Sequence, residues 1–65
     1  MKTADTIKAT LRTTSYNKAF CTAMDKGNVY DERNGHTWIE FADGSVACFI
    51  DASRTLRTYE EKPNY

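Results

Sequence analysis

Residues that commonly build metal sites, cofactor sites and disulfide scaffolds are scarce in this sequence. Its 65 residues include two cysteines, one histidine, three glycines and one proline. A single histidine and two well-separated cysteines, Cys21 and Cys48, cannot supply a tetrahedral zinc site of the usual spacing. Three glycines leave no glycine-rich phosphate loop, and two cysteines are too few for a disulfide scaffold. We therefore expect neither a metal nor another cofactor.

Long apolar runs are also missing. The longest, Val46–Ile50, has five residues, whereas a membrane-spanning helix needs about 20. The segment that follows Met1 lacks the apolar centre of a secretory signal. These absences predict a cytoplasmic protein, in a reducing compartment, that does not contact a membrane. Whether Cys21 and Cys48 form a bond stays open, because the bond requires the two Cα atoms to lie within about 7 Å of each other.

An excess of charge of either sign is absent as well. Nine basic and nine acidic residues give a formal net charge of zero, which disfavours strongly basic DNA-coating proteins and strongly acidic DNA mimics. The charges are nevertheless segregated, because residues 1–24 carry four basic groups and one acidic group, whereas residues 25–51 carry two basic and six acidic groups. An acidic side could therefore meet a basic partner.

The residues that are present suit one small folded domain. Hydrophobic residues make up 40% of the chain and charged residues 28%, which is typical of a globular protein rather than a disordered one. We expect a single domain over residues 1–65, with residues 62–65 as a frayed C-terminal end. A core of this size rarely supplies more than about 3–5 kcal/mol, so self-association or binding to a larger partner is expected.

Residues 4–13 fit either a helix or a strand. Ala4, Ile7 and Leu11 form a sparse helical stripe, whereas Ile7, Ala9 and Leu11 alternate with polar residues at strand spacing. The β-branched threonines in this segment favour a strand.

The next segment predicts a helix. Ser15 or Thr14 can serve as its N-cap, and apolar residues recur at three- and four-residue spacing. These residues are Tyr16, Ala19, Phe20, Ala23 and Met24. Lys26 suits the C-terminal end of the helix dipole, and Gly27 suits a left-handed stop.

Two dipeptides, Asn34-Gly35 and Asp43-Gly44, predict two-residue hairpin turns of type I′. A two-residue loop at Asp43-Gly44 pairs Phe41 with Val46, Ile39 with Cys48 and Thr37 with Ile50 on one largely apolar face. A loop longer by one residue would instead place Glu40 beside Val46 and Trp38 beside Cys48, so the apolar pattern favours the shorter loop.

One helix can cover only one face of such a sheet. The expected outer face carries Trp38 paired with Phe49, together with Val29, and is edged by Asp31 and Glu40. Pairing through the Asn34-Gly35 turn places Asp31 beside Trp38 and Val29 beside Glu40. Aromatic residues with a polar rim are typical of the centre of a protein interface.

The final segment, residues 53–61, fits a helical turn through Leu56 and Tyr59 or an edge strand through Leu56 and Thr58, and it could cover the outer face. The fold class is therefore α+β, with a small antiparallel sheet in the order β-α-β-β-β and one helix on one face. The alternative is one or more N-terminal helical segments followed by a three-stranded meander.

Catalytic residues are not expected. Nucleophilic catalysis would require His36 to activate Cys21 or Cys48, but Cys48 is expected on a buried strand face, where a thiol behaves as a small apolar group. A metal site made of Asp31, Glu32 and His36 would lack its remaining ligands. The sequence does not indicate an enzyme.

The lead hypothesis is a non-enzymatic binding protein that contacts a larger protein or its own copy through the Trp38 face. Its size resembles that of small regulators and inhibitors made by phages and mobile elements, which is an analogy and not an inference from residues. The alternative is weak nucleic-acid binding through Lys8, Arg12 and Lys18 in the basic N-terminal segment.

Overall fold

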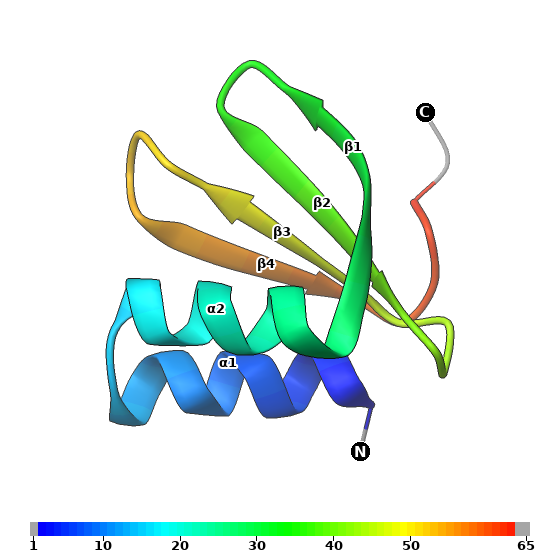
Figure 1. The fold of residues 1–65 in the computed structure, drawn as a ribbon, viewed down its shortest axis with the longest axis horizontal. Helices are drawn as coiled ribbons and strands as arrows, with labels where there is room; N and C mark the ends of the chain where they lie inside the picture. The colour runs from blue at the N-terminus through cyan, green and yellow to red at the C-terminus, as the bar shows by residue number, and fades with distance from the viewer. Residues whose placement is uncertain (1, 64–65) are drawn as a thin grey trace.

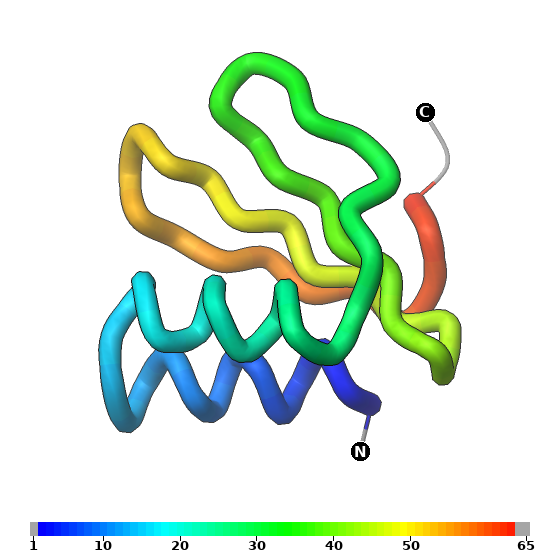
Figure 2. Tube along the Cα trace, viewed as in Figure 1, coloured from blue at the N-terminus to red at the C-terminus, as the bar shows by residue number. Residues whose placement is uncertain are grey.

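The computed structural model describes residues 2–63 as a small α+β fold in which two helices precede a four-stranded antiparallel sheet (Figure 1). The sheet is a meander with the strand order β1-β2-β3-β4, and the chain passes directly from the second helix into the first strand (Figure 2). The elements are α1 (Thr3–Thr13), α2 (Tyr16–Lys26), β1 (Gly27–Arg33), β2 (His36–Phe41), β3 (Val46–Ile50) and β4 (Thr55–Tyr59). The α+β class is confirmed.

The N-terminal segment is a helix, so the expected strand over residues 4–13 is wrong and the helical alternative is correct. Its threonines adapt to the helix because their hydroxyl groups donate to carbonyl oxygens one turn earlier. Thr10 Oγ1 donates to the oxygen of Thr6 at 3.1 Å, and Thr14 Oγ1 donates to that of Thr10 at 2.6 Å. The sparse stripe is sufficient because Ala4 and Ile7 are almost fully buried.

The helix expected after Ser15 is confirmed as α2, with the Ser15 hydroxyl accepting a hydrogen bond from the Lys18 amide at 3.2 Å. Two details differ from the expectation. Met24 is 45% exposed. Gly27 has an extended backbone, with φ −133° and ψ −173°, and is not a left-handed stop.

The first hairpin has the expected two-residue turn, since Asn34 and Gly35 have φ values of 55° and 76° and Arg33 pairs with His36. Asp31 lies beside Trp38, as expected. The register then shifts between Val29 and Asp31. This bulge pairs Val29 with Ile39 instead of Glu40 and moves Val29 to the helix side of the sheet.

The second hairpin has a three-residue loop, so the expected register of β2 and β3 is wrong by one residue. The Gly44 amide donates to the Phe41 oxygen at 2.9 Å, and the Phe41 amide donates to the Ser45 oxygen at 2.9 Å. Gly44 has φ 89°, as in a type I turn followed by a bulge. Glu40 therefore lies beside Val46 and Trp38 beside Cys48. The apolar pattern was misleading because both faces of β3 are buried.

The last segment is an edge strand, β4, which pairs with β3. Both faces of the sheet carry a buried cluster. The helix-side cluster includes Ala4, Ile7, Ala19, Ala23, Ile39, Phe41, Ala47, Phe49 and Leu56. The opposite cluster consists of Trp38, Val46 and Cys48, with Tyr30, Ile50 and Tyr59 packed against it. Neither helix in residues 2–63 has the length and hydrophobicity that a membrane span requires.

Candidate functional site

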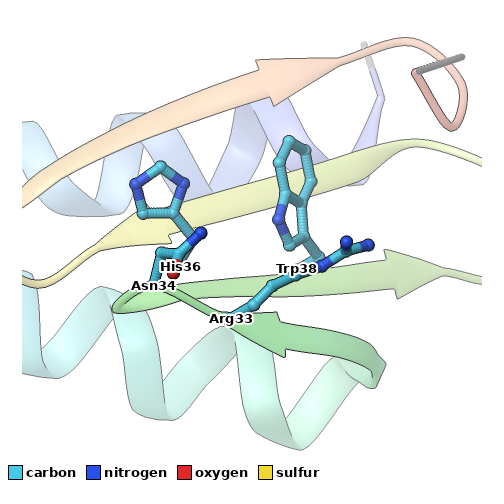
Figure 3. A pocket seen from close by; sticks show the side chains of 4 residues that line it. All are labelled: Arg33, Asn34, His36 and Trp38. Carbon is cyan, nitrogen blue, oxygen red and sulfur yellow. The ribbon is translucent and has the colours of Figure 1, made fainter.

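The candidate site is the face of the sheet that points away from the helices, which we call the open face. In Figure 3 both helices lie behind the sheet, and the rings of His36 and Trp38 project from β2 on the other side. The registers define three rows of open-face residues across the strands. In the order β1 to β4, the rows are Arg33, His36, Ile50 and Thr55, then Asp31, Trp38, Cys48 and Arg57, then Asn28, Glu40, Val46 and Tyr59.

Aromatic rings form the centre of the open face. The ring centroid of Trp38 lies 5.6 Å from that of Tyr59 and 6.5 Å from that of Tyr30. These neighbours leave only 8% of Trp38 exposed. The Trp38 ring is therefore largely buried beneath its neighbours, and little of its aromatic plane is free for a ligand to stack on.

A hollow of about 350 Å³ lies beside this ring system. Its walls come from three strands, and the residues are His36, Trp38, Cys48, Ile50, Arg57 and Tyr59. A second hollow, of about 360 Å³, adjoins it at the β1–β2 turn and shares His36 and Trp38, with Arg33 and Asn34 as its other lining residues (Figure 3). The open face thus combines an apolar floor with polar and cationic walls.

Both carboxylates of the open face are paired within the chain. Asp31 Oδ2 accepts from the guanidinium of Arg33 at 2.7 Å. Glu40 Oε1 lies 3.4 Å from Lys62 Nζ, which also lies 4.5 Å from the ring centroid of Tyr30. Lys62, expected in a frayed end, thus lies against the sheet, whereas residues 64–65 of that end lie outside the described residues.

Arg57 differs from these groups. It is exposed on β4, at the wall of the first hollow. Among residues 2–63, no carboxylate lies within ion-pair distance of Arg57. The charge that the open face leaves for a ligand is therefore positive.

The structure brings together three of the five residues expected at a protein interface. Trp38, Asp31 and Glu40 share the open face. Phe49 does not, and its expected pairing with Trp38 is wrong, because the longer loop turns Phe49 into the helix-side cluster, where it is 0% exposed. Val29 is also on the helix side, at the sheet edge, and is 36% exposed.

Five residues of the hollow were not among the expected interface residues: His36, Cys48, Ile50, Arg57 and Tyr59. Cys48 and Ile50 were assigned to the covered face by the register error. Arg57 and Tyr59 could have been found from alternation in residues 55–59, since they flank Thr58 and face opposite to Leu56 and Thr58.

The basic residues of the alternative hypothesis lie on the helical layer. Lys8 and Arg12 belong to α1 and Lys18 to α2. They therefore lie on the opposite side of the sheet from the aromatic cluster, and the two groups do not form one surface.

The thiols of both cysteines are free. Cys21 is exposed on α2, whereas Cys48 is 1% exposed under the open face. Burial raises the pKa of the Cys48 thiol, and the charge of nearby Arg57 opposes this shift. Asp31, Glu32 and His36 do not converge, and residues 2–63 contain no group of three or more side chains arranged to ligate a metal.

Comparison of the chain with protein families, curated proteins and solved structures gave no match.

Proposed function

We propose that this chain is a non-enzymatic binding protein that regulates or inhibits a larger protein by contacting it through the open face. The observation that supports this proposal is the asymmetry of the sheet. Two helices cover one face, whereas the other presents an aromatic centre with a hollow and charged edges. Apolar centres with polar rims are typical of protein interfaces.

The layered construction suits this role. The helix-side cluster holds the sheet in place, so that the hollow is formed before a partner arrives. Preorganisation of this kind reduces the conformational entropy that binding costs. The free thiols of Cys21 and Cys48 support a cytoplasmic location, because reducing compartments keep cysteines unpaired.

Photocrosslinking tests which layer meets the partner. A benzoylphenylalanine is placed at Ile50 on the open face or, as a matched control, at Lys18 on α2, and each full-length chain is irradiated in lysate of the source cells. We expect one protein adduct from the Ile50 position only, unchanged by nuclease and competed by unlabelled wild-type chain. An Ile50→Lys competitor, checked for folding by circular dichroism, should not compete.

Three results would contradict this function. Adducts from Lys18 alone would place binding on the helices. Loss of the adduct after nuclease treatment would favour nucleic-acid binding through Lys8, Arg12 and Lys18. An adduct of twice the mass of the chain would identify a second copy as the partner instead of a larger protein.

A further inference from the structure

The hollow between β2, β3 and β4 gives a more specific indication of what the partner presents. We propose that it receives an acidic side chain of the partner, with the carboxylate bound by Arg57 and a neighbouring apolar side chain packed against Ile50 and Tyr59. This inference rests on the proposed function and deepens it, since it names the chemistry of the partner.

The charges of the open face favour an acidic ligand over a basic one. Asp31 is occupied by Arg33 at 2.7 Å, and Glu40 by Lys62 at 3.4 Å. A basic partner would have to displace one of these internal cations before it gained a carboxylate. An acidic partner meets Arg57, which has no carboxylate partner among residues 2–63, without breaking any internal pair.

The geometry of Arg57 also suits a carboxylate. In the central row Arg57 follows Cys48, so its stem rises from β4 at the wall of the hollow. A guanidinium presents parallel N–H donors that match the two oxygens of a carboxylate. His36 lines the same hollow from β2 and adds a ring nitrogen as a second polar contact.

The remaining walls limit what can accompany the carboxylate. Trp38, Ile50 and Tyr59 offer apolar surface, and Cys48 forms a buried apolar part of the floor. A volume of about 350 Å³ accommodates one or two side chains but not a folded element. Apolar surface of this kind favours an aliphatic side chain beside the acid. An extended segment with leucine two residues from glutamate would supply both, because residues i and i+2 share a face.

Nucleic acid fits this hollow less well. A phosphate backbone is held by several cations along its path. Among the residues that line the hollow, Arg57 is the one lysine or arginine. Base stacking needs an exposed aromatic plane, and Trp38 is 8% exposed.

The test uses the full chain and defined peptides. An acetylated, amidated pentapeptide with leucine at its second position, glutamate at its fourth and serine elsewhere is titrated against the protein, with versions that carry glutamine or lysine in place of glutamate as controls. Trp38, the single tryptophan, reports binding by its fluorescence, and amide NMR shifts identify the residues affected. We expect saturable shifts at Ile50 and Arg57 with the glutamate peptide, weaker ones with glutamine and none with lysine.

Charge removal at Arg57 gives the matched comparison. Arg57→Gln should weaken binding of the glutamate peptide about fivefold, as expected for one solvent-accessible charged contact. Arg12→Gln, which removes an exposed arginine from α1, should leave the affinity unchanged. Higher ionic strength should weaken binding to the wild type more than to Arg57→Gln.

Several outcomes would overturn this inference. They are equal binding of the glutamate and glutamine peptides, shifts outside the hollow, and tighter binding of a thymidine hexanucleotide at Arg57. Absence of peptide binding would also overturn it, while the photocrosslinking from Ile50 decides separately whether the open face binds a protein.

Discussion

Gly27 is a residue whose missing side chain is required by close packing. A Cβ atom at this position would lie 2.7 Å from Ile39 Cγ2, 2.7 Å from Phe41 Cδ1 and 2.8 Å from the Glu40 oxygen. Since one of these neighbours is backbone and the others are buried, we expect Gly27→Ala to reduce the free energy of unfolding by about 1–3 kcal/mol. Urea denaturation followed by Trp38 fluorescence measures this change. Asn28→Ala, at the exposed next position, is the control, and an equal effect of both variants would contradict this account.

Tyr16 connects α2 to the turn between β3 and β4. Its hydroxyl donates to Asp51 Oδ1 at 2.9 Å, and its ring packs edge-on against Phe49 at 5.6 Å. Burial, reinforced by the Asp51 hydrogen bond, raises the pKa of Tyr16 from 10.0 to about 12. Because the unfolded chain ionises first, this contribution to stability is complete below pH 10.0 and is lost as the pH rises towards 12.

Tyr16→Phe tests both consequences. Loss of the hydrogen bond should reduce the free energy of unfolding by about 0.5–1.5 kcal/mol near neutral pH. The variant should also lack the tyrosine that titrates near pH 12, and its stability should fall less between pH 10.0 and 12 than that of the wild type. Ultraviolet absorbance of tyrosinate measures the titration. An unchanged titration curve would show that another tyrosine has the raised pKa.

At the scale of elements, the N-terminus of α1 is capped from the loop between β2 and β3. Asp43 Oδ2 accepts from the Thr3 amide at 2.7 Å and from the Thr3 hydroxyl at 2.9 Å. Ser45 Oγ accepts from the Ala4 amide at 3.1 Å and donates to Asp43 Oδ1 at 2.6 Å. These hydrogen bonds hold the pKa of Asp43 well below 3.8, and the bond from the Ser45 hydroxyl has the largest effect. The Asp43 carboxylate therefore retains its charge in mild acid.

The buried Ser45 makes this cap testable. Ser45→Ala leaves the Ala4 amide without an acceptor in a buried position, which should cost about 1–3 kcal/mol of unfolding free energy. Hydrogen exchange at Ala4 should also accelerate more than exchange in α2. Ser53→Ala, in the exposed turn before β4, should change neither quantity. Uniform acceleration in both helices would indicate general destabilisation instead of a lost cap.

The same cap explains which elements could be predicted from the sequence. The α2 helix and the Asn34-Gly35 turn depend on local signals, namely the Ser15 cap and a dipeptide that tolerates positive φ. The α1 helix has no side-chain cap of its own at Lys2 and receives one from Asp43, which is 40 residues away from Thr3. The sequence therefore predicts a strand for this threonine-rich segment, because the residue that caps its helix is distant in sequence.

The candidate site could be predicted only in part, for a related reason. Trp38 and Glu40 share a face because they are two residues apart on β2, and Asp31 joins them because it lies opposite Trp38 across the correctly predicted turn. Phe49 and Ile50 were exchanged between faces because a three-residue loop follows Phe41, and a shift of one residue inverts every side chain of β3. Since both faces of β3 are apolar, hydrophobic alternation could not reveal this shift.

At the scale of the whole molecule, the sheet separates a buried helix-side cluster from the open face, and adjacent residues of β3 test that separation. Phe49 is 0% exposed and packs edge-on against Tyr16 and Phe20, with centroids 5.6 and 5.2 Å apart. Phe49→Ala should cost about 3–5 kcal/mol, which is comparable to the whole stability expected of so small a core. We therefore expect this variant to be unfolded by circular dichroism at ambient temperature.

Ile50→Ala is the matched comparison, because Ile50 is the next residue but faces the hollow and is only partly buried. We expect this variant to fold, with a smaller loss of unfolding free energy in urea and with altered Trp38 fluorescence. A folded Phe49→Ala together with an unfolded Ile50→Ala would contradict this assignment of faces. That result would instead support a two-residue loop, with Ile50 on the helix side and Phe49 on the open face. If Phe49→Ala is the more destabilising of the two variants, stability depends on the helix side of β3. Binding at the open face can then be altered through Ile50 and Arg57 in a chain that still folds.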